Sequence, residues 1–275
     1  MLINFSKMHG LGNDFVVIDA INQTVRLSSE QIRNMADRRH GVGFDQLLMV
    51  KEAQGDAGFR YAIYNADGSE VSQCGNGARC FALFVTQKGL TDKSSIRVET
   101  NAGEIILSIS ADNMVQVNMG VPNFQPANIP LAMAEENGTY EVEIEQQRVT
   151  FSALTIGNPH AVVQVADIAA APLETVGKIL ESHAVFPQRA NIGFSQIISE
   201  SEIALRVYER GAGETLACGS GACAAAISAI ELGLVKSPVK VTLPGGDLNV
   251  TWRGRGNPVM MTGPATFVFD GTMQL

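Results

Sequence analysis

The stretch Glu70-Val-Ser-Gln-Cys74-Gly-Asn-Gly-Ala78 decides the fold, because Glu214-Thr-Leu-Ala-Cys218-Gly-Ser-Gly-Ala222 repeats its pattern at an offset of 144 residues (218 − 74). Further matches follow in nearly the same register: Ile63-Tyr64-Asn65 with Val207-Tyr208-Glu209 at 144, Gly12-Asn13 with Gly157-Asn158 at 145, and Gly43-Phe44-Asp45-Gln46-Leu47-Leu48 with Gly193-Phe194-Ser195-Gln196-Ile197-Ile198 at 150. Matches in one order at nearly one offset predict a duplicated domain with two pseudo-symmetric halves.

A seam between the halves is expected near Gly120-Val-Pro-Asn123, where strand-like sequence meets sequence rich in Pro and Asn. This seam gives a predicted N-terminal half at residues 1–119 and a C-terminal half at residues 120–263. Because ligands often bind at domain interfaces, we expect a ligand to sit between the two halves.

Each half is predicted to be a sheet-rich α+β domain wrapped around one central helix. The segments Gly77–Gly89 and Gly221–Gly233 are apolar nearly all round, which is typical of buried helices. An amphipathic helix with a serine cap is expected over Ser29–Arg38. Short runs rich in β-branched or aromatic residues predict strands at Phe15–Asp19, Gln46–Val50, Tyr61–Tyr64, Ser95–Glu99, Ile105–Ile109 and Met114–Asn118.

A cysteine stands just before each predicted central helix, in the turns Cys74-Gly75-Asn76-Gly77 and Cys218-Gly219-Ser220-Gly221. Helix N-termini attract anions and lower the pKa of a nearby thiol, and glycines let the backbone approach a ligand or adopt unusual angles. Two such turns face to face would bind a substrate carboxylate and place one sulfur on each side of its α-carbon. The pattern predicts that one thiolate removes the α-proton and the opposite thiol returns one to the other face.

The composition excludes several classes of protein. Hydrophobic residues make up 45% and charged residues 17%, which favours a packed globular chain. The net charge of −8 disfavours nucleic-acid binding, although a local cationic pocket for an anionic substrate remains compatible with it. With no signal peptide and no apolar run of membrane-spanning length, a cytoplasmic protein with no membrane partner is expected. Four cysteines in 275 residues are too few for a disulfide scaffold.

Several long motifs resemble those of the diaminopimelate epimerase family. The two cysteine segments, Asn65 to Cys80 and Glu209 to Ala224, are similar to its two active-site signatures. The resemblance extends to Lys7-Met-His-Gly-Leu-Gly-Asn13, Gly157-Asn158-Pro-His160, Leu243-Pro-Gly-Gly and Met261-Thr-Gly-Pro-Ala, so it runs essentially from end to end. One small departure is Ser220, where many members have Thr; both side chains offer a hydroxyl.

The resemblance implies interconversion of LL- and meso-diaminopimelate without pyridoxal phosphate or metal, in lysine and cell-wall synthesis. It implies a small-molecule substrate, a homodimer, and a C-terminal segment, 264–275, that completes the first half. Cys74 and Cys218 are the implied catalytic residues, and His160 and Glu209 are implied to tune them or to bind the reacting amino group. The implied substrate-binding residues are Asn13, Gln46, Asn65, Gly75, Asn76, Asn158, Asn191, Glu209, Arg210, Gly219 and Ser220.

Chemistry supports these assignments and leaves alternatives open. The planar guanidinium of Arg210 suits a distal carboxylate. Cys80 and Cys223 fall inside the apolar helices and are interpreted as core residues. Zinc fits the cysteine spacing poorly, phosphate binding lacks a matching glycine fingerprint, and a bond between Cys74 and Cys218 would be an inactive oxidised form. A racemase or isomerase of the same architecture without the cysteine pair, and a non-enzymatic thiol sensor or amino-acid-binding regulator, are the competing functions.

Overall fold

The computed structural model describes residues 2–71 and 74–275. Its internal contacts divide the chain into two compact units. The first unit consists of Met1–Asn118 and Thr262–Leu275, and the second of Met119–Met261. Both are sheet-rich, with one long helix each, as predicted from the sequence.

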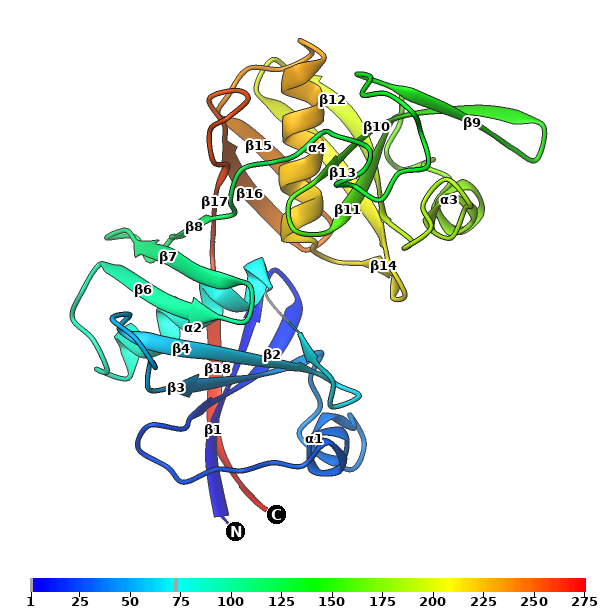
Figure 1. The fold of residues 1–275 in the computed structure, drawn as a ribbon. Coiled ribbons are helices and arrows are strands. Elements are labelled where there is room, and N and C mark those ends of the chain that lie inside the picture. Colours follow the sequence, from blue (N-terminus) through cyan, green and yellow to red (C-terminus); the bar gives the residue numbers. More distant parts are fainter. Residues whose placement is uncertain (1, 72–73) are drawn as a thin grey trace. The chain divides into compact units, whose positions relative to one another are not determined.

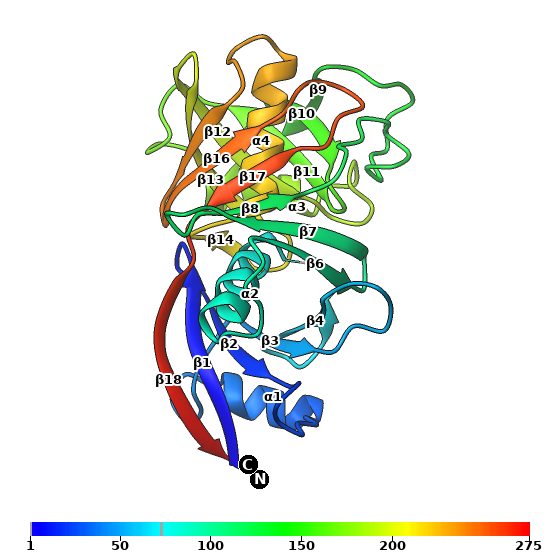
Figure 2. The same cartoon turned by 90° about the vertical axis from the view of Figure 1, so that its left-hand side faces the viewer.

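All strands of the first unit except the last, β18, follow one another in the first part of the chain, and most of them contact helix α2. In order, its elements are β1 Leu2–Gly10, β2 Asn13–Asp19, α1 Ser29–Ala36, β3 Gln46–Lys51, β4 Phe59–Asn65, β5 Glu70–Val71, α2 Gly75–Gln87, β6 Ser95–Thr100, β7 Gly103–Ile109, β8 Val115–Asn118 and β18 Thr266–Gln274. The last strand, β18, comes from the end of the chain and pairs antiparallel with β1, so the two ribbons run side by side in Figure 2.

The second unit has a similar order of elements around helix α4. These are β9 Tyr140–Ile144, β10 Gln147–Thr155, β11 Pro159–Gln164, the π-helical turn η1 Leu173–Gly177, α3 Lys178–Glu181, β12 Asn191–Ser199, β13 Glu202–Glu209, β14 Gly213–Thr215, α4 Gly219–Glu231, β15 Val239–Leu243, β16 Gly246–Thr251 and β17 Met260–Gly263, whose last two residues belong to the first unit. Figure 1 shows α4 with the strands of this unit around it.

Strand pairing demonstrates the internal repeat. In the first unit β2 pairs parallel with β3, β3 antiparallel with β4, and β4 parallel with β6. In the second unit β11, β12, β13 and β15 make the same sequence of parallel, antiparallel and parallel pairings. The duplication predicted from the cysteine motifs is therefore present in the topology of each unit.

The register corrects one of the sequence matches. Phe15 lies opposite Gln46 in the first unit, and His160 lies opposite Asn191 in the second. Gln46 therefore corresponds to Asn191 at an offset of 145, and the match of Gly43–Leu48 with Gly193–Ile198 at 150 is wrong. A short alternation of Gly, Phe and aliphatic residues fits many strand positions, whereas hydrogen-bonded pairing allows one register only.

The two central helices are buried, as expected from their composition. Every residue of α2 from Asn76 to Val85 is buried, and so is every residue of α4 from Gly221 to Ala229. Helix α2 contacts β1, β2, β3, β7, β8 and β18, and α4 contacts β10, β11, β12, β13, β15 and β16. The strands of each unit thus surround its helix and remove nearly all of the apolar helix surface from water. Burial of apolar surface is the main favourable term in folding.

Helix α1 covers another face of the first sheet. Its Ile32, Met35 and Ala36 pack with residues of β1, β2 and β3. Ser28 caps this helix and exchanges hydrogen bonds with Gln31 in a capping box. The helix ends at Ala36 rather than at Arg38 as predicted, because Asp37 leaves the helical conformation and its carboxylate accepts the Arg39 and His40 N–H groups.

No helix within residues 2–71 and 74–275 combines the length and the apolar character that crossing a bilayer requires.

Candidate active site

Each unit places a cysteine at the N-cap of its central helix. Cys74 caps α2 and Cys218 caps α4, both in an extended backbone conformation. The glycine-containing segments that follow were predicted to be turns before the helices, but they are the first helical turns themselves. The helices start at Gly75 and Gly219, two residues earlier than expected, so both sulfurs lie at the positive ends of helix dipoles.

The second glycine of each motif is needed for close packing rather than for an unusual φ. A Cβ at Gly77 would clash with the hydroxyl of Tyr61, a buried residue of β4. A Cβ at Gly221 would lie 3.1 Å from Val207 Cγ2 and 3.2 Å from the sulfur of Cys218. The absence of a side chain lets each helix start close to the neighbouring strand β4 or β13.

In the first unit, Asn13 joins the start of β2 to the start of α2. Its Oδ1 accepts a hydrogen bond of 3.2 Å from Asn76 Nδ2 and lies 3.9 Å from Cys74 Sγ. Gln46 donates through Nε2 to Asn65 Oδ1 at 3.0 Å, across the β3–β4 pair. Among the described residues, buried Gln46 Oε1 has no hydrogen-bond partner, which leaves an acceptor for a ligand donor.

In the second unit, Ser220 and Asn158 are in polar contact beside Cys218. Cys218 Sγ lies 3.7 Å from Ser220 Oγ, which accepts a hydrogen bond of 3.3 Å from Asn158 Nδ2. His160 Nε2 lies 3.0 Å from Asn158 Oδ1. Because that oxygen can only accept, His160 donates to it through Nε2.

Asn191 and Arg210 lie at the ends of β12 and β13. The side chain of Asn191 is buried, donates to Pro159 O at 3.2 Å and accepts from the Arg210 N–H at 3.0 Å. The exposed guanidinium of Arg210 donates to Gln188 O at 3.2 Å. Asn191 thus fixes the backbone from which the Arg210 side chain projects, and Glu209 on the same strand end accepts from the hydroxyl of Thr215.

The strand register shows which candidate residues of the first unit correspond to candidate residues of the second. Gln46 corresponds to Asn191, and their cross-strand neighbours Asn65 and Glu209 also correspond, at offsets of 145 and 144. Cys74 and Asn76 correspond to Cys218 and Ser220 in the same way. Each unit therefore gathers one cysteine and its polar neighbours at the N-terminus of its helix.

Burial changes the expected behaviour of Cys218. Only 4% of this residue is exposed, and desolvation raises the pKa of its thiol well above the usual value. The carboxylate of Glu209 raises the pKa further, while the Gly221 N–H and the Ser220 hydroxyl lower it. The lowered thiol pKa predicted from the helix N-terminus is wrong for Cys218, because desolvation and a nearby negative charge outweigh the helix dipole.

Burial also keeps the imidazole of His160 neutral. Desolvation, reinforced by the positive charge of Arg210, lowers the pKa of His160 to about 3. A neutral ring can donate to Asn158 through one nitrogen without placing a second positive charge beside Arg210.

This shift predicts a stability change in acid. Between the ordinary histidine pKa of about 6.5 and the folded value of about 3, the unfolded chain binds one more proton than the folded chain. His160 should therefore make the free energy of unfolding fall by about 1.4 kcal/mol per pH unit as the pH drops through this window. We expect urea unfolding curves of the wild type and His160→Gln to converge between pH 6.5 and pH 4. A constant difference between them would contradict the assignment.

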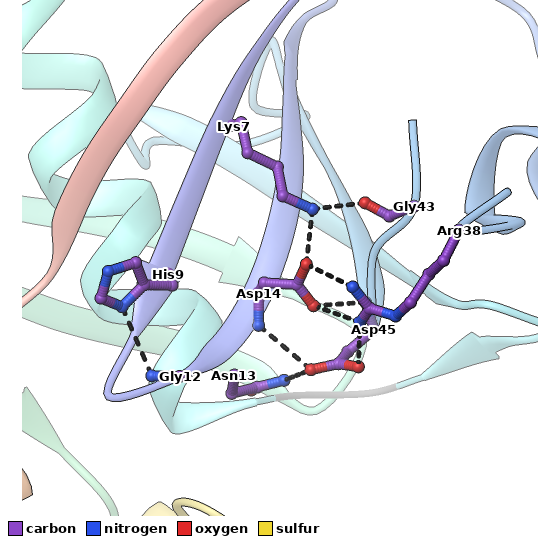
Figure 3. A network of polar contacts seen from close by, with 8 residues as sticks. All are labelled: Lys7, His9, Gly12, Asn13, Asp14, Arg38, Gly43 and Asp45. Carbon is purple, nitrogen blue, oxygen red and sulfur yellow. Dashed lines mark hydrogen bonds and ion pairs between the residues drawn. The ribbon is translucent and has the colours of Figure 1, made fainter. Parts of the chain in front are cut away.

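Two groups of residues escaped the sequence analysis. Lys7, Asp14, Arg38 and Asp45 form a charged network next to Asn13 (Figure 3). In the second unit, Glu181 is only 2% exposed, forms an ion pair with Arg189 and accepts from the Gly211 N–H at 2.9 Å, next to Arg210. Asp14 directly follows Asn13 and Asp45 directly precedes Gln46, so acidic residues next to an implied binding residue were the available signal.

The cysteine alternatives can be compared with these contacts. Cys80 and Cys223 are fully buried in α2 and α4, which confirms their interpretation as core residues. Burial raises the pKa of the Cys80 thiol to about 12. No disulfide joins any of the four cysteines, all of which lie in the described part of the chain. Over the same described residues, no cluster of three or more His, Cys, Asp or Glu side chains could hold a metal ion.

The same fold is found in solved structures of other proteins. Over the whole chain, the structure matches a PhzF-family phenazine biosynthesis protein of Bacillus anthracis with a TM-score of 0.72 and 16% identity, covering 100% of both chains. It matches a hydroxyproline epimerase of Agrobacterium vitis, solved with bound trans-4-hydroxy-L-proline, with a TM-score of 0.70 and 15% identity, covering 98% of this chain and 92% of the other. At such low identity, these similarities establish the fold alone.

Sequence comparison is more specific. The family profile described as diaminopimelate epimerase matches residues 5–125 and 152–268. The diaminopimelate epimerase of Nitrosospira multiformis is 54% identical over 275 residues, covering 100% of this chain and 99% of the relative. The chain belongs to the diaminopimelate epimerase family.

Proposed function

We propose that this protein interconverts LL- and meso-2,6-diaminopimelate by a two-base proton transfer between Cys74 and Cys218, as a step of lysine and peptidoglycan precursor synthesis. The observation that carries the proposal is the matched placement of the two cysteines at helix N-caps. Cys74 lies next to the side-chain amide of Asn13, and Cys218 lies next to the hydroxyl of Ser220. Family membership supplies the substrate.

The first chemical step breaks the α-C–H bond of the substrate. One cysteine reacts as the thiolate, takes the proton to form S–H, and leaves the electron pair on the α-carbon. The negative charge spreads into the adjacent carboxylate, where backbone N–H groups at the starts of α2 and α4 would stabilise it. The side chains of Asn76 and Ser220 lie in those turns and offer further donors.

The second step inverts the centre. The opposite cysteine, present as the thiol, donates its proton to the other face of the carbanion and becomes the thiolate. The net result is one inverted α-carbon and an exchange of protonation states between the two sulfurs, so the following turnover in the same direction requires proton re-equilibration with solvent. No cofactor is needed to balance these steps.

Glu209 links substrate binding to the ionisation of Cys218. The carboxylate of Glu209 raises the pKa of the Cys218 thiol. A substrate ammonium group bound to Glu209 would neutralise this charge and remove its effect on the thiol. Substrate binding would then lower the pKa of the Cys218 thiol toward the range that proton transfer needs, which is the tuning role proposed for Glu209. His160 binds Asn158, which in turn binds Ser220, so His160 would act on Cys218 through these two neighbours.

Recognition of the distal end would use the remaining polar groups. The distal half of diaminopimelate carries a carboxylate and an ammonium group. Arg210 offers a planar fork of N–H donors for the carboxylate. Gln46 Oε1, which has no hydrogen-bond partner within residues 2–71 and 74–275, offers an acceptor. Asn65 and Asn191 would complete the set, the latter by fixing the Arg210 backbone.

Proton exchange with solvent tests the proposal directly. The reduced protein is incubated with LL-diaminopimelate in deuterated water without added cofactor, and the reaction is followed by NMR. We expect deuterium to enter one α-position as the meso isomer forms. Exchange that occurs only with a different amino acid would support the two-cysteine mechanism and show that diaminopimelate is not the substrate. No exchange with any amino acid, in folded and reduced protein, would overturn the proposal.

We further infer a cytoplasmic homodimer. Three consecutive apolar side chains of β18, Phe267, Val268 and Phe269, are 36%, 50% and 46% exposed, which is unusual for one strand and favours a covering surface. A second copy of the chain is the proposed occupant. Sedimentation equilibrium should give twice the chain mass, and Val268→Asp should shift the protein toward the monomer at micromolar concentration. A monomeric wild type at all concentrations would exclude the dimer.

A further inference from the structure

We propose that Asp45 is a positioning residue that holds the amide of Asn13 in one orientation, so that a carbonyl oxygen faces Cys74 and the first turn of α2. Asp45 precedes β3 and is not among the residues that the family resemblance implies. The inference rests on the proposed function, because it assigns Asp45 a role in the chemistry of Cys74.

The orientation of Asn13 follows from hydrogen-bond chemistry. Its Nδ2 donates to Asp45 Oδ2 at 3.0 Å. An ionised carboxylate has no proton to donate, so only the NH₂ end of the Asn13 amide can face it. The other end, Oδ1, is therefore the group that accepts from Asn76 and lies 3.9 Å from Cys74 Sγ.

A charged network fixes Asp45 in turn (Figure 3). Arg38 Nη2 donates to Asp45 Oδ1 at 2.8 Å and to Asp14 Oδ1 at 2.7 Å. The Asp14 N–H donates to Asp45 Oδ2 at 3.1 Å, and the Asp45 N–H donates back to the Asp14 side chain at 3.0 Å. Lys7 donates to Asp14 and to the Gly43 carbonyl.

The network is electrically balanced, since two cations face two carboxylates. Burial alone would raise the pKa of Asp14, but hydrogen bonds from Arg38 and Lys7 hold it well below its usual range. Asp14 thus stays ionised at any pH at which the enzyme would work. Asp14 is bound by both cations, and Asp45 connects this ion-paired group to Asn13.

The second unit orients the corresponding asparagine in the opposite sense. Asn158 directs Oδ1 to His160 and Nδ2 to Ser220. By the strand register, Asp45 corresponds to Ala190, and His160 corresponds to Phe15, so each unit lacks the orienting residue of the other. Cys74 therefore has an amide acceptor beside it, and the group beside Cys218 is bound to an amide donor.

This difference has a chemical consequence for the two sulfurs. A carbonyl oxygen beside Cys74 favours the protonated thiol and can also accept from a substrate ammonium group, whereas an amide NH₂ in its place would favour the thiolate and repel the ammonium group. Without Asp45, the Asn13 amide could adopt either orientation, and only one would be productive. Misplacement of a positioned group on this scale costs about 10- to 100-fold in rate.

A double-mutant cycle on kcat/KM tests whether Asp45 acts through Asn13. Wild type, Asp45→Ala, Asn13→Ala and the double variant are compared with LL-diaminopimelate as substrate. We expect Asp45→Ala alone to lower kcat/KM about 10-fold or more, and to have less than about a threefold effect in the Asn13→Ala background. Asp112→Asn, at an exposed aspartate between β7 and β8, serves as the matched control and should leave kcat/KM unchanged.

Equal effects of Asp45→Ala in both backgrounds would overturn the inference, because a structural role alone does not depend on Asn13. Melting temperatures of all four proteins separate loss of folded protein from loss of positioning. If Asp45→Ala does not fold, the same cycle is run with Asp45→Ser, which keeps a polar side chain in the loop. A wild type that leaves diaminopimelate unchanged would instead refute the proposed function, which the cycle does not address.

Discussion

Cys74→Ala and Cys218→Ala are each expected to lower kcat/KM for diaminopimelate epimerisation by at least about 10³-fold, in both directions of the reaction. Inversion needs one group to remove the proton and another to deliver it from the opposite face. Alanine at either position leaves one face without the thiol that removes or delivers the proton. The polar neighbours Asn13 and Asn76 are amides and Ser220 is a hydroxyl, so they are poor replacements for a thiol as acid or base. The carboxylate next to Cys218, that of Glu209, is the group proposed to bind the substrate ammonium.

The two single losses should not multiply. Because both cysteines serve one reaction, Cys74→Ala combined with Cys218→Ala should be little worse than either change alone. The measurement is the rate of meso isomer formation by chiral chromatography, with folding checked by circular dichroism. Cys223→Ala is the matched control: this fully buried cysteine of α4 lies outside the proposed machinery and should keep near-normal activity. Inversion within tenfold of the wild type in either active-site variant would refute the two-base assignment.

Local sequence patterns were enough to predict the architecture. The cysteine motifs and their spacing predicted the duplication, and the nearly continuous apolar character of the segments after Gly77 and Gly221 predicted two buried helices. Both features depend on residues close together in the chain, where periodicity carries the signal. The helix starts were misplaced by two residues, because glycine was interpreted as a turn signal although Gly75 and Gly219 occupy the first helical turn.

Long-range contacts were less accessible to sequence analysis. The correspondence of Gln46 with Asn191 is defined by pairing between strands, whereas the local residue pattern favoured a match shifted by five residues. The network of Lys7, Asp14, Arg38 and Asp45 joins β1, β2 and the loop after α1, so no single spacing reveals it. The raised pKa of Cys218 depends on burial and on Glu209, which lies nine residues away on another element (218 − 209).

Arg210→Lys is expected to lower kcat/KM for diaminopimelate by about 10- to 100-fold, mainly through a higher KM. A guanidinium can give a carboxylate two parallel hydrogen bonds, whereas an ammonium group is a point charge and keeps one of them at best. Losing one charge-assisted hydrogen bond costs about 1.5–3 kcal/mol, which corresponds to this range. The backbone of residue 210 should stay in place, because Asn191 binds its N–H and not its side chain.

A substrate without the distal carboxylate separates recognition from chemistry. Lysine has the same chain as diaminopimelate but no second carboxylate, so its slow α-proton exchange should be nearly the same in the wild type and in Arg210→Lys. Arg206→Lys is the matched control, because Arg206 lies on β13, the strand that directly precedes Arg210, and forms its ion pair with Glu214. An equal loss with both substrates would mean that Arg210 supports the cysteine chemistry and not the distal end. Since the positive charge of Arg210 also helps to lower the pKa of His160, that outcome would point to His160 as the connection.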